Sequence, residues 1–162
     1  MLSAAVITVS DSGFEGRRED VSGEVVRSVL ADNGFEIREK IILPDDYDEL
    51  VCNFVRLADV EGINLVVTTG GTGFSPRDVT PEATLAVCDR QAQGVAEAMR
   101  ANSMQYTSRA MLSRAVCAIR GGTVILNLPG SPKACRENLE FVIEPLIHGL
   151  NILCGKDGEC AR

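Results

Sequence analysis

Two spacings of hydrophobic residues alternate along the chain and predict its secondary structure. Short apolar runs rich in β-branched residues are typical of buried strands, and longer stretches with an apolar residue at every third or fourth position are typical of helices. The predicted strands cover residues 4–10, 35–43, 65–69, 116–119 and 123–128. The predicted helices cover residues 21–33, 44–58, 80–89 and 95–104, and a last helix begins after Ser131. Because strands alternate with helices, we expect an α/β fold with crossover connections and a mostly parallel sheet, ending in a hairpin at Gly121 and Gly122.

Polar or glycine-rich loops follow three of the predicted strands. Their sequences are TVSDS at 8–12, TTGGTG at 68–73 and NLPGSPK at 127–133. In a parallel sheet the carboxyl ends of the strands lie at one edge, and ligands bind beyond that edge. We therefore expect these three loops to form a binding site.

The second loop contains Gly70, Gly71 and Gly73. Glycine adopts positive φ at little cost, which turns backbone N–H groups toward an anion such as phosphate. The loop lacks the Lys and Ser or Thr of a P-loop, and Pro76 stands where a dinucleotide-binding fingerprint needs its third glycine. Phosphate binding and a plain strand-to-helix turn are both compatible with this loop.

Neighbouring charged residues give a second set of candidates. Arg77 could bind a phosphate and Asp78 could hold a hard divalent metal, but the two could equally form a surface ion pair. Asp45 follows a proline at the start of a predicted helix, where it could be functional or could cap the helix. Asp46 or Asp48 could cap that helix equally well.

Three further loop positions also have a structural and a functional interpretation. Ser131 and Pro132 begin the last helix, whose free N–H groups can bind an anion near Lys133, or Ser131 could be a plain cap. Asp11 could close its strand in an Asx turn or contact a ligand. Thr80 precedes a proline and is expected to cap the third helix.

Composition narrows the classes of protein that the chain can represent. Its 162 residues, with no shift in composition, predict one domain over residues 1–162 with a short tail from about 155. A net charge of −7 and 4% aromatic residues argue against a nucleic-acid partner. No signal peptide and no apolar run of ~20 residues is visible, so we expect a cytoplasmic protein that does not bind membranes. The six cysteines lack metal or redox spacing and are expected to be reduced and buried.

Five segments, in the order in which they occur, together resemble the molybdopterin adenylyltransferase family. They are TVSDS, LPDD, TTGGTGFSPRDVTPEAT, MLSRAVCAIRG and ILNLPGS, and the resemblance extends from residue 5 to about residue 154. It implies a three-layer α/β/α fold of the molybdopterin-binding, Rossmann-like type, and a homotrimer. It also implies transfer of AMP from ATP to the terminal phosphate of molybdopterin, with release of pyrophosphate and with Mg²⁺ as the metal. A molybdenum-insertion protein would be a downstream partner.

The resemblance also implies roles for individual residues. Asp78, in PRDVTPEA, and Asp45, after the proline of LPDD, correspond to catalytic positions expected to hold Mg²⁺. Neither needs to be a general base, because the nucleophile is already an anionic phosphate oxygen. The residues expected to contact nucleotide and pterin phosphate are Ser10, Asp11, Ser12, Gly70, Gly71, Thr72, Gly73, Arg77, Pro129, Gly130, Ser131 and Lys133. Which loop meets which ligand stays open, and Gln91 and Gln93 depart from the usual pattern of the family.

Two other functions are weighed against the adenylyltransferase. The first is a non-catalytic member of the same family that binds molybdopterin or serves as a scaffold, and intact Asp45 and Asp78 argue against it. The second is a dinucleotide-dependent oxidoreductase, which the failed glycine fingerprint disfavours. Product formation from ATP and molybdopterin, or binding of a nicotinamide, would distinguish the three.

Overall fold

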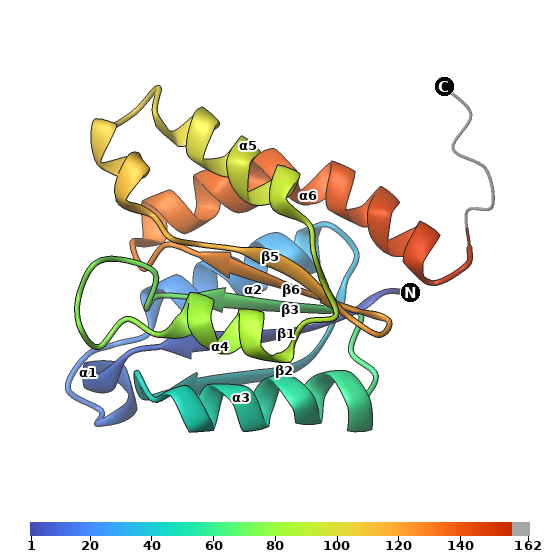
Figure 1. The fold of residues 1–162 in the computed structure, drawn as a ribbon, viewed down its shortest axis with the longest axis horizontal. Helices are drawn as coiled ribbons and strands as arrows, with labels where there is room; N and C mark the ends of the chain where they lie inside the picture. Colours follow the sequence, from blue (N-terminus) through green and yellow to red (C-terminus); the bar gives the residue numbers. More distant parts are fainter. Residues whose placement is uncertain (157–162) are drawn as a thin grey trace.

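A computed structural model describes residues 1–156; residues 157–162, which include Cys160 and most of the predicted tail, lie outside the described part. A six-stranded sheet forms the centre of the molecule (Figure 1). In spatial order its strands are β2 (Glu36–Leu43), β1 (Ser3–Val9), β3 (Leu65–Thr69), β6 (Thr123–Leu128), β5 (Cys117–Arg120) and β4 (Arg90–Gln91). The first four are parallel, and β5 is antiparallel to both of its neighbours. The predicted hairpin is therefore confirmed as β5 and β6.

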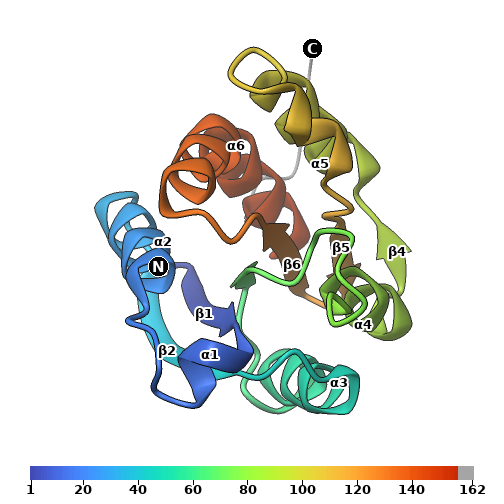
Figure 2. The same ribbon diagram turned by 90° about the vertical axis from the view of Figure 1, so that its left-hand side faces the viewer.

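Helices cover both faces of the sheet and give the molecule three layers (Figures 1 and 2). One face carries α2 (Val21–Asp32), α5 (Gln93–Ser103) and α6 (Pro132–Leu153), and the other carries α3 (Tyr47–Val55) and α4 (Thr80–Val87). The short α1 (Asp11–Phe14) follows β1, a π-helical turn (Arg56–Val60) extends α3, and a 3₁₀ helix (Ser108–Leu112) follows α5. The three-layer α/β fold and its mostly parallel sheet are confirmed. None of the helices in residues 1–156 is long and apolar enough to cross a bilayer.

The central strand β3 shows how the two cores are separated. Its five residues are all buried, and successive side chains point to opposite faces of the sheet. Leu65 and Val67 pack with the helices α2, α5 and α6, whereas Val66 packs with Phe54 of α3 on the other side. Burial of each such side chain contributes about 1.5–3 kcal/mol. This two-sided burial explains why a continuous apolar run predicted the strand correctly.

The beginnings of α3 and α4 differ in detail from the prediction, and α5 begins at Gln93 and not at residue 95. The helix expected from residue 44 begins at Tyr47, because Asp46 is extended and its side chain accepts the N–H of Glu49 (3.0 Å) as the N-cap. Thr80 is the first residue of α4 and not its cap, which is Val79. The Thr80 hydroxyl donates instead to the carbonyl of Gly70 (3.1 Å), so it ties the helix to the glycine loop.

The prediction that the cysteines are buried is only partly correct. Cys117 and Cys135 are buried, and burial raises the pKa of the Cys117 thiol to about 12 and that of Cys135 to about 11. Cys88 and Cys154 are half-buried, and Cys52 is exposed. Cys52 lies two positions from the buried Leu50 on α3, which places it on the opposite side of that helix.

Candidate active site

The three predicted loops meet at the carboxyl ends of β1, β3 and β6, which are adjacent strands (Figure 2). The N–H of Gly70 donates to the carbonyl of Leu128 (3.1 Å), and the Thr69 hydroxyl donates to that of Pro129 (2.8 Å). From α2, the Ser22 hydroxyl donates to the carbonyl of Gly130 (2.6 Å). The sheet order therefore brings together loops that are far apart in the sequence, as expected.

Gly70 and Gly71 each have a neighbour that excludes a side chain, and Gly73 has one in tight contact. A Cβ at Gly70 would lie 2.3 Å from the carbonyl oxygen of Val9, and one at Gly71 would lie 2.3 Å from Oγ1 of Thr80. Gly70 and Gly71 have positive φ (100° and 68°), as predicted. Gly73 does not, so the expectation is wrong for this residue, whose Cβ position lies 3.0 Å from Oδ2 of Asp78.

Asp45 and Asp11 are joined by two reciprocal hydrogen bonds. The N–H of Asp11 donates to Oδ2 of Asp45 (3.1 Å), and the N–H of Asp45 donates to Oδ1 of Asp11 (3.0 Å). Asp45 is therefore not a helix cap, and its Oδ1 lies 3.1 Å from where a Cβ of Gly71 would stand. Burial, together with the negative charges of Asp11 and Asp78, raises the pKa of Asp45 above its ordinary value.

Arg77 forms its ion pair with Asp11 and not with the adjacent Asp78. Its Nε and Nη2 donate to the two carboxylate oxygens of Asp11 at 3.0 and 2.9 Å. The hydrogen bonds from Arg77 have the largest effect on the pKa of Asp11, which they lower. The bond from the N–H of Asp45 lowers it further. The Asp11 carboxylate therefore does not form the Asx turn that was one option for it, but connects the loop of Asp45 with the loop of Arg77. The Arg77–Asp78 surface pair is thus excluded, and Oδ2 of Asp78 accepts the N–H of Ser75 (3.0 Å).

The two candidate metal ligands lie against the same glycine loop. Oxygens of Asp45 and Asp78 approach Gly71 and Gly73, and the charge of Asp78 contributes to the raised pKa of Asp45. Within residues 1–156, no three side chains of His, Cys, Asp or Glu form a group that could hold a metal ion by themselves. Mg²⁺ is usually held by one or two carboxylates together with substrate phosphates. The pair therefore fits a Mg²⁺ ion that arrives with a nucleotide.

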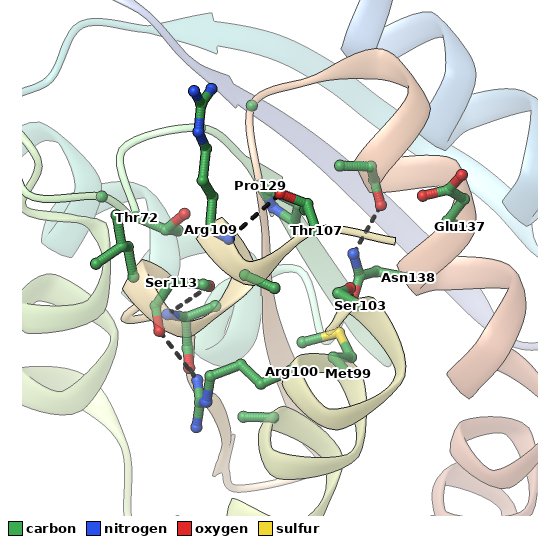
Figure 3. Close-up of a pocket in the computed structure, with 18 of the residues that line it drawn as sticks. Thr72, Met99, Arg100, Ser103, Thr107, Arg109, Ser113, Pro129, Glu137 and Asn138 are labelled. Atoms are coloured by element: carbon green, nitrogen blue, oxygen red, sulfur yellow. Dashed lines mark hydrogen bonds between the residues drawn. The ribbon is translucent and has the colours of Figure 1, made fainter. Parts of the chain in front are cut away.

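A cavity of about 420 Å³ opens beside the glycine loop, on the side of α5 and α6 (Figure 3). Its walls include Asp78, Thr72 and Pro129, the apolar Met99, and the 3₁₀ segment with Thr107 and Arg109. A smaller hollow of about 210 Å³ lies toward α2 and is lined by Ser10, Asp20 and Ser22, among others. Gly70 and Gly130 line both spaces, so the two loops form the boundary between them.

Among the remaining predicted contact residues, two serines are helix caps and Lys133 lies outside both spaces. Ser10 caps α1 by accepting the N–H of Gly13 (3.0 Å), and its hydroxyl lies 3.2 Å from that of Ser12. Ser131 caps α6, as its structural interpretation required. Lys133 lines neither space, although its exposed side chain lies 3.9 Å from Glu137, which lines the larger one.

Arg114 is a site residue that the sequence analysis did not single out. Its backbone N–H donates to the carbonyl of Thr72 (2.9 Å), and its Nε and Nη2 donate to those of Gly73 (2.7 Å) and Asp78 (2.8 Å). The available signal was its place in MLSRAVCAIRG, where a cation stands three positions before the first residue of β5.

Comparison with known proteins identifies the class to which this site belongs. Residues 5–149 match the family model described as a probable molybdopterin binding domain. The chain therefore belongs to the molybdopterin-binding domain family, and the resemblance seen in the sequence motifs is confirmed.

Individual relatives agree with this assignment over most of their length. The chain is 39% identical over 153 residues to the molybdopterin adenylyltransferase of Helicobacter pylori J99, covering 93% of this chain and 86% of the relative. It is 41% identical over 145 residues to that of Haemophilus influenzae, covering 88% and 73%. The structure matches that of the molybdopterin biosynthesis enzyme MoaB of Thermus thermophilus with a TM-score of 0.91 and 45% identity, covering 98% and 100%.

Proposed function

We propose that this protein is a molybdopterin adenylyltransferase, which transfers AMP from ATP to the terminal phosphate of molybdopterin and releases pyrophosphate. The proposal depends above all on one observation. The carboxylates of Asp45 and Asp78 both pack against the glycine loop, at the sheet edge where parallel α/β folds bind ligands. The names of the relatives identify molybdopterin and adenylyl transfer as the chemistry to test.

The reaction needs positioning and charge stabilisation more than it needs a base. An anionic oxygen of the molybdopterin phosphate forms a bond to the α-phosphorus of ATP. The bond from that phosphorus to the oxygen bridging the α- and β-phosphates breaks. Pyrophosphate leaves with the bonding electrons. Asp45 and Asp78 would hold Mg²⁺, which when bound offsets the negative charge on these phosphates. The protein's own contribution is to align the two anions and to supply N–H donors.

The two spaces on either side of Gly70 and Gly130 suggest how two substrates could meet. A ligand in the large cavity and a ligand in the hollow near α2 would both reach these residues. Gly71, Ser10 and the N-terminus of α6 then offer polar contacts for phosphate groups.

Assembly and location are part of the same proposal. Phe74, Tyr106 and Met111 are 70%, 62% and 62% exposed, and such apolar surface is compatible with the proposed homotrimer. A molybdenum-insertion protein is the downstream partner that we propose. The five described cysteines are free, which suits a reducing compartment such as the cytoplasm.

The decisive experiment supplies ATP, Mg²⁺ and molybdopterin to the purified protein. Adenylylated molybdopterin and pyrophosphate are the expected products, detected by chromatography and by a coupled pyrophosphate assay. Tight binding of molybdopterin without either product would contradict the proposal and would favour a non-catalytic member of the family.

A further inference from the structure

The loop that carries Asp78 is attached to the rest of the protein at its two ends and, in its middle, by the ion pair of Arg77 with Asp11. Residues 74–77 between these ends are exposed. Within the loop, Asp78 is bonded only to Ser75, through its N–H (2.9 Å) and its carboxylate (3.0 Å). The position of the Asp78 carboxylate beside Gly73 therefore depends in part on what holds the loop ends together. Thr80 donates to the carbonyls of Gly70 (3.1 Å) and Gly71 (3.2 Å), and Arg114 adds bonds nearer to Asp78.

Arg114 connects both ends. At the start of the loop its backbone N–H donates to the carbonyl of Thr72 and its Nε donates to that of Gly73, and at the end its Nη2 donates to that of Asp78. Its Nη1 also pairs with Glu82, which is half-exposed on α4. The guanidinium can bond to Gly73, Asp78 and Glu82 simultaneously because its donors point in fixed, different directions. The ammonium of lysine carries its donors on one atom and cannot span the same carbonyls.

Arg114 also connects this loop to the wall of the cavity. It directly follows residues 108–113, several of which line the 420 Å³ cavity beside Asp78. Its side chain is 33% exposed, so protein atoms cover most of it. One residue thus bonds the loop that presents the carboxylate and continues the chain segment that forms the cavity.

We propose that Arg114 is a positioning residue for the adenylyl transfer: it closes the loop from Gly73 to Asp78 and so holds the Asp78 carboxylate where a metal–nucleotide complex needs it. This inference depends on the function proposed above. Arg114 has no bond to the carboxylate itself, and it acts through the backbone. A displacement of about 1 Å in such a site can lower the rate by about a hundredfold.

The test compares R114K and R114Q with E82Q as the matched control. The E82Q variant removes the exposed ion-pair partner of Arg114 but leaves its bonds to the three carbonyls intact. Binding of Mn²⁺ in the presence of ATP is measured by electron paramagnetic resonance, turnover is measured across a range of Mg²⁺ concentrations, and thermal unfolding is recorded for every variant. Binding of molybdopterin is measured separately.

If Arg114 positions Asp78, both Arg114 variants should bind Mn²⁺ about tenfold more weakly with ATP, and excess Mg²⁺ should partly restore kcat. Molybdopterin affinity should be unchanged, and E82Q should match the wild type in each measurement. If folded R114K or R114Q bound Mn²⁺ as tightly as the wild type does, the inference would be overturned. An equal loss of Mn²⁺ affinity in E82Q would also overturn it. If the wild type bound Mn²⁺ with ATP but formed no product, the proposed function would fail while the positioning effect would still be measurable.

Discussion

Replacement of Asp78 by asparagine tests the central carboxylate of the proposed site with little change in shape. Oδ2 of Asp78 accepts the N–H of Ser75 at 3.0 Å, and the carbonyl oxygen of an asparagine can accept the same bond. The substitution therefore removes a negative charge next to Gly73 but keeps the loop closed. Arg114 continues to hold the backbone, since its bond is to the Asp78 carbonyl.

The expected effects on stability and on activity differ in size. A hydrogen bond to a charged acceptor contributes about 1.5–3 kcal/mol and a neutral one about 0.5–1.5 kcal/mol, so Asp78→Asn should cost about 1 kcal/mol of stability. Relief of repulsion with Asp45 acts in the opposite direction, because the charge of Asp78 opposes ionisation of that carboxyl. Loss of one charge-stabilising group from a preorganised site should lower kcat by about a hundredfold or more.

Pyrophosphate release should be measured at saturating and at limiting Mg²⁺, with molybdopterin binding measured in parallel. Asp46→Asn is the control, because Asp46 caps α3 from an exposed position and asparagine is an equally good cap. We expect the control to retain activity and both variants to bind molybdopterin. Near-normal turnover of Asp78→Asn at limiting Mg²⁺ would refute the assignment of this carboxylate.

Three further results are expected. Carboxyl NMR titration should show a raised pKa for Asp45 that falls in Asp78→Asn, and an unchanged pKa would contradict the proximity of the two carboxylates. Wild-type activity should decline as the pH falls through the pKa of Asp45, because a protonated carboxyl holds metal poorly. Gly71→Ala should lower the free energy of unfolding by at least about 1–2 kcal/mol, because its φ is 68° and a Cβ would meet Thr80 at 2.3 Å, whereas Gly122→Ala, with open space around it, should change little in the same denaturant titration. Light scattering should give three times the chain mass of 17.4 kDa, and a monomer at micromolar concentration would count against the trimer.

The parts of the fold that could be predicted are those that burial alone determines. The strand β3 is buried along its whole length because helices cover both of its faces, and the apolar run that begins it shows this in the sequence. The strand β4 could not be predicted, since Arg90 and Gln91 are polar and exposed. It forms because the flanking N–H groups of Asp89 and Ala92 reach carbonyls of β5, both at 2.8 Å. Such pairing is decided by tertiary structure and leaves no pattern in the local sequence.

The same distinction separates the predicted and the missed parts of the site. The topology of a parallel sheet predicted that the loops after β1, β3 and β6 would meet, and the structure brings them together. The partner of Arg77 is Asp11, which lies 66 positions earlier in the chain, and not the adjacent Asp78. Arg114 bonds to backbone carbonyls, which every residue has, so no particular residue type could have indicated its partners.

The glycine loop shows how one sequence motif can serve two physical purposes. Read as a phosphate-binding loop, Gly70, Gly71 and Gly73 should share positive φ, but only the first two do. Gly73 has an ordinary backbone conformation, and its missing side chain leaves space for the carboxylate of Asp78. At Gly71 both requirements coincide, because the residue has positive φ and also faces Asp45. Close approach of the carboxylates to the loop thus accounts for the third glycine, and it places negative charge beside N–H groups suited to phosphate, an arrangement that is favourable when a cation lies between carboxylate and phosphate.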